Sequence, residues 1–148
     1  MKPVLYLDID GVLWDVTETG TFKGSNGLEE FMTFAFEHFE VRWLTTWGHF
    51  QGCLDEKGLE TLSNFTKLPI DLWKKVKPNL GWEDLKTEGI NWPEHVAGRR
   101  FVWVEDGLLP AELQILAERG FLDCYIHTDI FDDPDALIKT HEKLKSRA

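Results

Sequence analysis

Short apolar runs alternate with amphipathic stretches along this chain, and this alternation limits the possible folds more than any other feature. Residues 4–7 (Val-Leu-Tyr-Leu) are continuously apolar, which is typical of a strand that is buried on both faces. Further strands are predicted at residues 41–44, 100–104 and 124–127. Helical patterns lie between them, at residues 27–39, 50–65 with Gly58 as a candidate interruption, 110–120, and from Pro134 onward. This order predicts an α/β fold, a three-layer α/β/α sandwich around a mainly parallel sheet.

No part of the chain is predicted to form a second domain. Residues 66–98 are rich in proline and glycine and predict short helices or turns. A length of 148 residues is within the usual size of one domain, and no linker or repeat interrupts it, so we expect a single domain over 1–148.

Charge and cysteine content narrow the possible partners and the compartment. The net charge of -10 repels phosphate backbones, so nucleic acid is not expected as a partner. Cys53 and Cys124 are far apart and lack partners at zinc-binding spacing, which favours reduced thiols and a cytoplasmic location. No apolar run approaches the ~20 residues that cross a bilayer, so no membrane association is expected.

Polar side chains follow three of the predicted strands. Asp8 and Asp10 follow the first strand, Thr45 follows the second, and Glu105 and Asp106 follow the third. Ligands bind at the carboxyl ends of the strands in such sheets, so we expect these side chains to meet at one edge.

The spacing of Asp8 and Asp10 has a chemical meaning. Side chains two residues apart on an extended segment point to the same side, so both carboxylates can face one ligand. A divalent cation would keep one as a carboxylate and leave the other able to carry a proton. Gly11 then allows the chain to turn away sharply.

Three segments resemble motifs of the haloacid dehalogenase superfamily. Residues 5–13 (LYLDIDGVL) are similar to its first motif, residues 43–47 (WLTTW) to its second, and residues 101–106 (FVWVED) to its fourth. They occur in the family's order and span most of the chain. The resemblance implies a Rossmann-like sheet and, because the chain is short, a member without a sizeable cap domain. Residues 14–22, with Gly20 as the turn, resemble the family's flap hairpin.

The resemblance also implies an activity, that of a phosphatase or phosphotransferase acting on a phosphomonoester. Asp8 would attack phosphorus and form an aspartyl-phosphate, and Asp10 would be the general acid and base. Mg²⁺ would be held by Asp8, the Asp10 backbone carbonyl, and one or both of Glu105 and Asp106. Because a glutamate is longer than the usual aspartate, Asp106 is a candidate for the main ligand. Thr45 would hold a phosphoryl oxygen.

The family's third motif is a lysine, and two residues compete for this role. Lys86 is the first choice because of its distance before the fourth motif, and Lys77 is nearly as good. Trp14 and Trp47 flank the motifs and either stack on a planar substrate group or pack at the rim of the sheet.

The substrate and the class of protein stay partly open. An open site is associated in this family with large substrates, so a phosphoprotein is a candidate beside a phosphorylated small molecule. A catalytically silent relative that acts as a binding module is the main alternative. A receiver-type signalling domain is disfavoured, because it needs an aspartate where Thr45 stands and a lysine where His127 stands.

Overall fold

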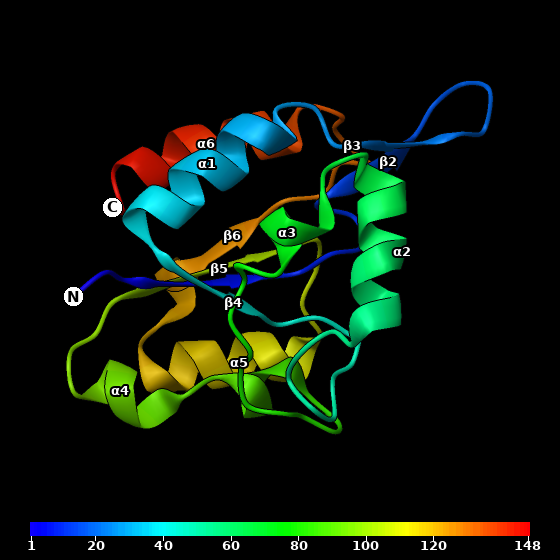
Figure 1. The fold of residues 1–148 in the computed structure, drawn as a ribbon. Helices are drawn as coiled ribbons and strands as arrows, with labels where there is room; N and C mark the ends of the chain where they lie inside the picture. The colour runs from blue at the N-terminus through cyan, green and yellow to red at the C-terminus, as the bar shows by residue number, and fades with distance from the viewer.

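A four-stranded parallel sheet forms the centre of the protein (Figure 1). The computed structural model describes residues 1–148. The strands lie in the order β4-β1-β5-β6, and each neighbouring pair is parallel. Their bounds are Val4–Leu7 for β1, Glu40–Trp43 for β4, Phe101–Glu105 for β5 and Tyr125–His127 for β6. The predicted α/β fold with a parallel sheet is confirmed, and the layout is compatible with a Rossmann-like sheet.

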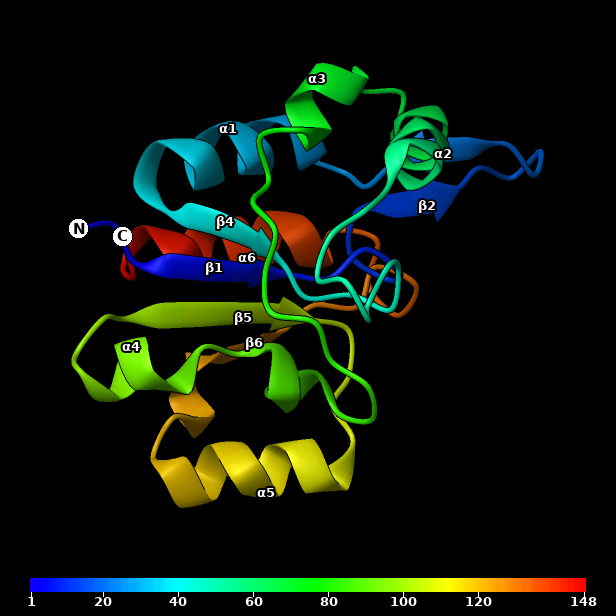
Figure 2. The same ribbon diagram turned by 60° about the horizontal axis from the view of Figure 1, so that its bottom comes forward.

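Helices lie on both sides of this sheet (Figures 1 and 2). On one side, α1 (Leu28–His38) packs beside α6 (Ala136–Lys145). On the other side lie α4 (Trp92–Val96) and α5 (Pro110–Arg119). No helix is both long and apolar enough to cross a membrane.

Alternate residues of β1 explain why both sides are covered. Leu5 and Leu7 belong to a large buried cluster with α1 and α6, whereas Val4 and Tyr6 belong to a second cluster with Leu116 of α5. Every side chain of β1 is buried, so the strand contributes apolar surface to two cores at once. This is the physical reason for its continuous apolar sequence.

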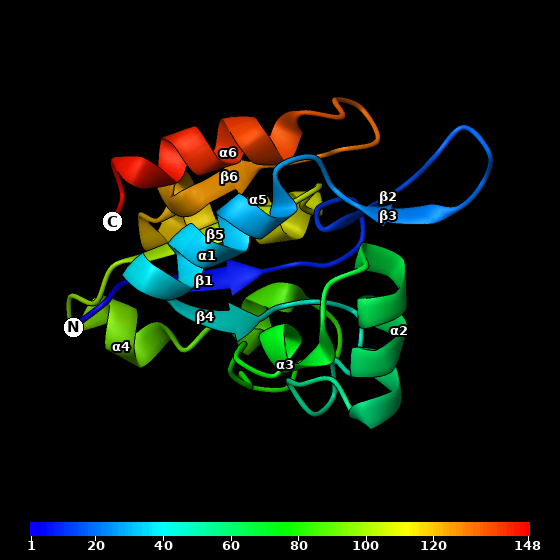
Figure 3. The same ribbon diagram turned by 45° about the horizontal axis from the view of Figure 1, so that its top comes forward.

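Further elements gather beyond the carboxyl ends of the strands. The antiparallel hairpin of β2 (Trp14–Val16) and β3 (Phe22–Gly24) projects from this end and packs against α2 (Glu56–Thr66) (Figure 3). Its tip turns at Gly20, whose φ of 84° favours glycine. The hairpin predicted at residues 14–22 is therefore present.

The remaining short elements are α3 (Ile70–Trp73), η1 (Lys86–Gly89) and η2 (Leu122–Cys124).

The predicted helix over 50–65 is wrong in its first part. The helix α2 begins only at Glu56, after Asp55, whose carboxylate accepts a 2.8 Å hydrogen bond from the Gly58 N–H. Gly58 therefore lies in the first turn and does not interrupt the helix. The preceding segment is a turn, and Gly52 has a φ of 72° and so little space that a Cβ would overlap the Asn79 carbonyl. The last helix likewise begins at Ala136, two residues after the predicted Pro134.

Candidate active site

The register of the sheet brings the predicted strand-end residues together. Leu7 of β1 is paired with Trp43 of β4 and with Val104 of β5. The Asp8 N–H donates to the Val104 carbonyl at 3.2 Å, and the Leu44 N–H donates to the Leu7 carbonyl at 2.9 Å. Asp8 and Thr45, just after β1 and β4, and Glu105, the last residue of β5, therefore lie at one edge of the sheet.

This edge includes the point where the strand order reverses direction. The chain passes from β1 to β4 on one side and then returns to β5 on the other side of β1. Such a reversal leaves a crevice outside the carboxyl ends of the two strands that flank it. Asp8 follows β1, and Glu105 ends β5, so these acids lie at the reversal.

Three carboxylates converge there. Asp8, Glu105 and Asp106 each offer an oxygen, and these oxygens lie within 4.8 Å of one another. Asp8 and Glu105 are buried, whereas Asp106 is partly exposed. Asp106 packs directly on Gly11, where a Cβ would overlap the carboxylate and where φ is 75°. A glycine is therefore required beside this cluster, which gives the Asp-x-Asp-Gly sequence a steric basis.

Lys86 supplies a positive charge to the cluster. Its Nζ lies 2.6 Å from Glu105 Oε2 and 3.3 Å from Asp8 Oδ1, and its side chain is largely buried. Lys77, the competing candidate, lies elsewhere: its exposed Nζ contacts Glu40 at 3.1 Å. Glu40 begins β4, at the opposite end of the sheet. The structure thus places Lys86, and not Lys77, beside the predicted nucleophile.

Burial and charge together set the protonation of these groups. Burial raises the pKa of Asp8, and Lys86 opposes the rise. The pKa of Glu105 is also raised, by burial and by repulsion from Asp8, although Lys86 acts in the other direction. Burial alone would lower the pKa of Lys86, but Asp8 and Glu105 outweigh it, so this pKa is above its ordinary value. The raised pKa values of Asp8 and Glu105 show that burial and mutual repulsion disfavour full ionisation of the cluster, and that one ammonium group offsets this only in part.

The Asp10 carboxylate has different partners. Trp14 Nε1 donates to its Oδ1 at 3.0 Å, and Trp47 Nε1 lies 3.2 Å from both Oδ1 and Oδ2. Asp10 does not belong to the group of three converging carboxylates. These hydrogen bonds were not predicted from the sequence, which indicated stacking on a substrate group or packing at the rim of the sheet for the two tryptophans. The spacing of four residues between Asp10 and Trp14 was the one available signal.

Thr45 and Glu112 complete the surroundings of the cluster. Thr45 is buried, and its Oγ1 accepts a 3.4 Å hydrogen bond from the Trp47 N–H. Glu112 was not predicted; its buried carboxylate accepts the backbone N–H of Lys86 at 2.8 Å and that of Leu109 at 2.9 Å. It thereby ties η1 to the start of α5. The signal that could have identified Glu112 is the proline at the first position of α5 with an acid two residues later, which is typical of a helix start.

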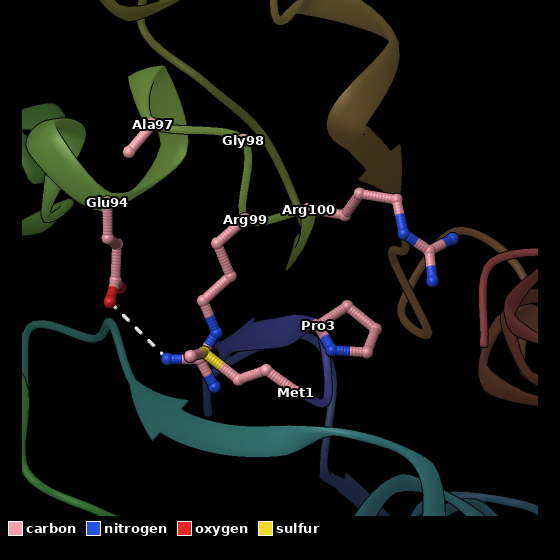
Figure 4. Close-up of a pocket in the computed structure, with 7 residues that line it drawn as sticks. All are labelled: Met1, Pro3, Glu94, Ala97, Gly98, Arg99 and Arg100. Carbon is pink, nitrogen blue, oxygen red and sulfur yellow. Dashed lines mark hydrogen bonds and ion pairs between the residues drawn. The ribbon is translucent and has the colours of Figure 1, made fainter.

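A cavity of about 460 Å³ lies at the opposite end of the sheet (Figure 4). Pro3 and Arg100 line it, next to the first residues of β1 and β5, and Arg99 forms an ion pair there with Glu94 at 3.3 Å. None of the residues predicted for catalysis or metal binding lines this cavity. This cavity and the group of converging carboxylates are therefore separate, at opposite ends of the sheet.

No family model, no curated protein sequence and no solved structure matches this chain. The site is accordingly interpreted from its own residues, and membership of the haloacid dehalogenase superfamily stays a prediction.

Proposed function

We propose that this protein is a Mg²⁺-dependent phosphatase or phosphotransferase that acts on a phosphomonoester through an aspartyl-phosphate on Asp8. We also propose that the fold is a three-layer α/β/α sandwich, and that the protein is a member of the haloacid dehalogenase superfamily without a sizeable cap domain. One observation carries it: the carboxylates of Asp8, Glu105 and Asp106 converge within 4.8 Å at the reversal of strand order, with Lys86 against Asp8.

The donor set suits Mg²⁺. Three carboxylates beside one ammonium group leave an excess of two negative charges when all are ionised, which a divalent cation neutralises. Oxygen ligands are those that Mg²⁺ prefers. Because Lys86 lies closer to Glu105, at 2.6 Å, than to Asp8, at 3.3 Å, Asp8 and Asp106 are the favoured side-chain ligands, with Glu105 and the Asp10 carbonyl as further candidates. When bound, Mg²⁺ would neutralise charge on the phosphoryl group and on the attacking carboxylate.

The residues of the chain can be assigned to two chemical steps. In the first, an Asp8 oxygen forms a bond to phosphorus while the bond to the leaving oxygen breaks, and that oxygen takes a proton from Asp10. In the second, a water gives a proton to Asp10 and attacks phosphorus, which releases phosphate and regenerates Asp8. Lys86 lies where it would offset the charge on Asp8, and the Thr45 hydroxyl would donate to a phosphoryl oxygen.

Hydrolysis of p-nitrophenyl phosphate in the presence of MgCl₂ tests this proposal. We expect turnover by the wild-type protein, none by Asp8→Asn, and a kcat about 100-fold or more lower in Asp10→Asn, because the second step needs Asp10 as the base for water whichever group has left. Asp71→Asn is a matched control, because Asp71 is an exposed residue of α3.

Two results would contradict the proposal in different ways. Turnover by Asp8→Asn at the wild-type rate would show that Asp8 is not the nucleophile. Failure of the wild-type protein on p-nitrophenyl phosphate and on panels of phosphorylated metabolites and phosphopeptides would instead favour a catalytically silent binding module.

A further inference from the structure

We infer that Trp14 and Trp47 are positioning residues that hold the Asp10 carboxylate in the orientation needed to transfer a proton to the leaving group. The inference rests on the proposed function, because it assigns Asp10 as the general acid and base. It adds two residues that the resemblance to the family did not assign to this role.

The two indoles reach Asp10 from different parts of the chain. Trp14 begins β2 of the projecting hairpin, whereas Trp47 lies in the loop that follows β4. Both indole N–H groups point to the same carboxylate: Trp14 contacts Oδ1 at 3.0 Å, and Trp47 lies 3.2 Å from each oxygen. Two donors from independent elements restrict the rotation of a carboxylate far more than one donor does.

Aromatic packing holds the donors themselves in place. The Trp14 ring makes edge contacts with Phe22, Phe65 and Phe131, at centroid distances of 5.6, 5.2 and 5.5 Å. The Trp47 ring also makes an edge contact with Phe65, at 6.1 Å. Edge-to-face pairs at these distances are favourable, so they stabilise the position in which each indole N–H faces Asp10.

The two carboxylate oxygens of Asp10 are unequal in this arrangement. Oδ1 accepts from both indoles, while Oδ2 has only the shared contact with Trp47. A proton on Oδ1 would compete with two N–H donors for the lone pairs of that oxygen. The geometry therefore points to Oδ2 as the atom that gives the proton to the leaving oxygen and later takes one from water.

The dependence of rate on the leaving group tests this role. A p-nitrophenolate ion leaves readily without a proton, whereas an alkoxide such as that of glycerol 2-phosphate needs one. We expect Trp14→Phe and Trp47→Phe, which keep an aromatic ring but lose the N–H, to lower kcat/KM for glycerol 2-phosphate about 10-fold, a fraction of a full general-acid contribution. The loss for p-nitrophenyl phosphate should be below about 3-fold, because protonation matters less there.

Trp82→Phe is the matched control, because Trp82 is a partly buried tryptophan that packs against His49 and not against Asp10. Equal losses for the two substrates in the Trp14 and Trp47 variants would show a general structural effect and would overturn the inference. So would unchanged rates. An inactive wild-type protein would instead remove the proposed function, and this role with it.

A direct measurement of the indole hydrogen bonds to Asp10 distinguishes failure of this inference from failure of the proposed function. The chain has seven tryptophans, so its ¹H–¹⁵N spectrum should show seven indole N–H signals. We expect Asp10→Ala to shift two of them most strongly, namely the two that disappear in Trp14→Phe and Trp47→Phe. Unshifted signals for those two residues would refute the hydrogen bonds on which the inference depends.

Discussion

Lys86 contacts the buried carboxylates of Asp8 and Glu105. A single substitution that removes its charge tests its role in the site. We expect Lys86→Met, which preserves much of the side-chain length, to lower kcat/KM for p-nitrophenyl phosphate by about 100-fold, the size of losing one strong electrostatic contact to the reacting groups. The matched control is Lys77→Met, because the Lys77 Nζ contacts Glu40 at the other end of the sheet. This variant should keep wild-type activity.

The fold should survive the loss of Lys86, which makes the kinetic result interpretable. Removing one partner of a buried pair is costly when the other stays charged. Here the pKa of Glu105 is already raised by burial and by Asp8, so its carboxyl group can take up a proton instead. Circular dichroism should therefore show a folded variant. Wild-type activity in folded Lys86→Met would contradict the role given to this lysine.

Single residues differ in how far the sequence alone could place them. Asp8, Thr45 and Glu105 were predictable because they lie at or just after the carboxyl ends of apolar strands, and parallel strands bring these ends to one edge. Lys86 was preferred to Lys77 only from its distance before the fourth motif, because residues 66–98 lack a regular period from which a position in space could be inferred.

Among the elements, the strands were predicted best and α2 worst. A strand buried on both faces needs a continuous apolar run, so β1 was located at its observed bounds. The start of α2 was misplaced because the turns before it depend on tertiary contacts. Gly52, for example, lies against the Asn79 carbonyl, which is distant in sequence. A local pattern carries no information on such a contact.

The hairpin of β2 and β3 is held to α2 by a stacked aromatic pair, and this contact gives a prediction at the level of elements. The rings of Phe22 and Phe65 stack with centroids 4.1 Å apart, and Phe65 also packs against both Trp14 and Trp47. We expect Phe65→Ala to speed hydrogen exchange across the hairpin and to lower the free energy of unfolding by about 1–3 kcal/mol, since it removes aromatic pairs and leaves a space.

Phe50→Ala is the comparison for this variant, because Phe50 is 69% exposed and lies outside the hairpin contact. It should leave exchange in the hairpin unchanged. If Phe65→Ala also left it unchanged, the hairpin would not depend on α2 for its order.

At the scale of the whole molecule, stability and the proposed activity make opposite demands on the same edge of the sheet. Two apolar cores pack the faces of β1, and the chain then places acids and a lysine immediately beyond that strand. Crowded carboxylates repel one another, and burial makes the repulsion stronger. The fold therefore tolerates a local cost where the two cores end, and a bound cation would relieve it.

Because a bound cation would reduce the repulsion among these carboxylates, we expect Mg²⁺ to raise the free energy of unfolding of the whole domain. A ligand that binds only the native state adds RT ln(1 + [L]/Kd) to the free energy of unfolding, about 2.7 kcal/mol when its concentration is 100 times Kd. We expect Tm to rise as MgCl₂ is added at constant ionic strength, and to stay nearly constant in Asp106→Asn, because this change removes a carboxylate from the cluster. Asp71→Asn, on exposed α3, should respond like the wild-type protein. An equal rise in Asp106→Asn would show that Mg²⁺ acts elsewhere on this acidic chain, and the three converging carboxylates would then lose their assignment as the metal site.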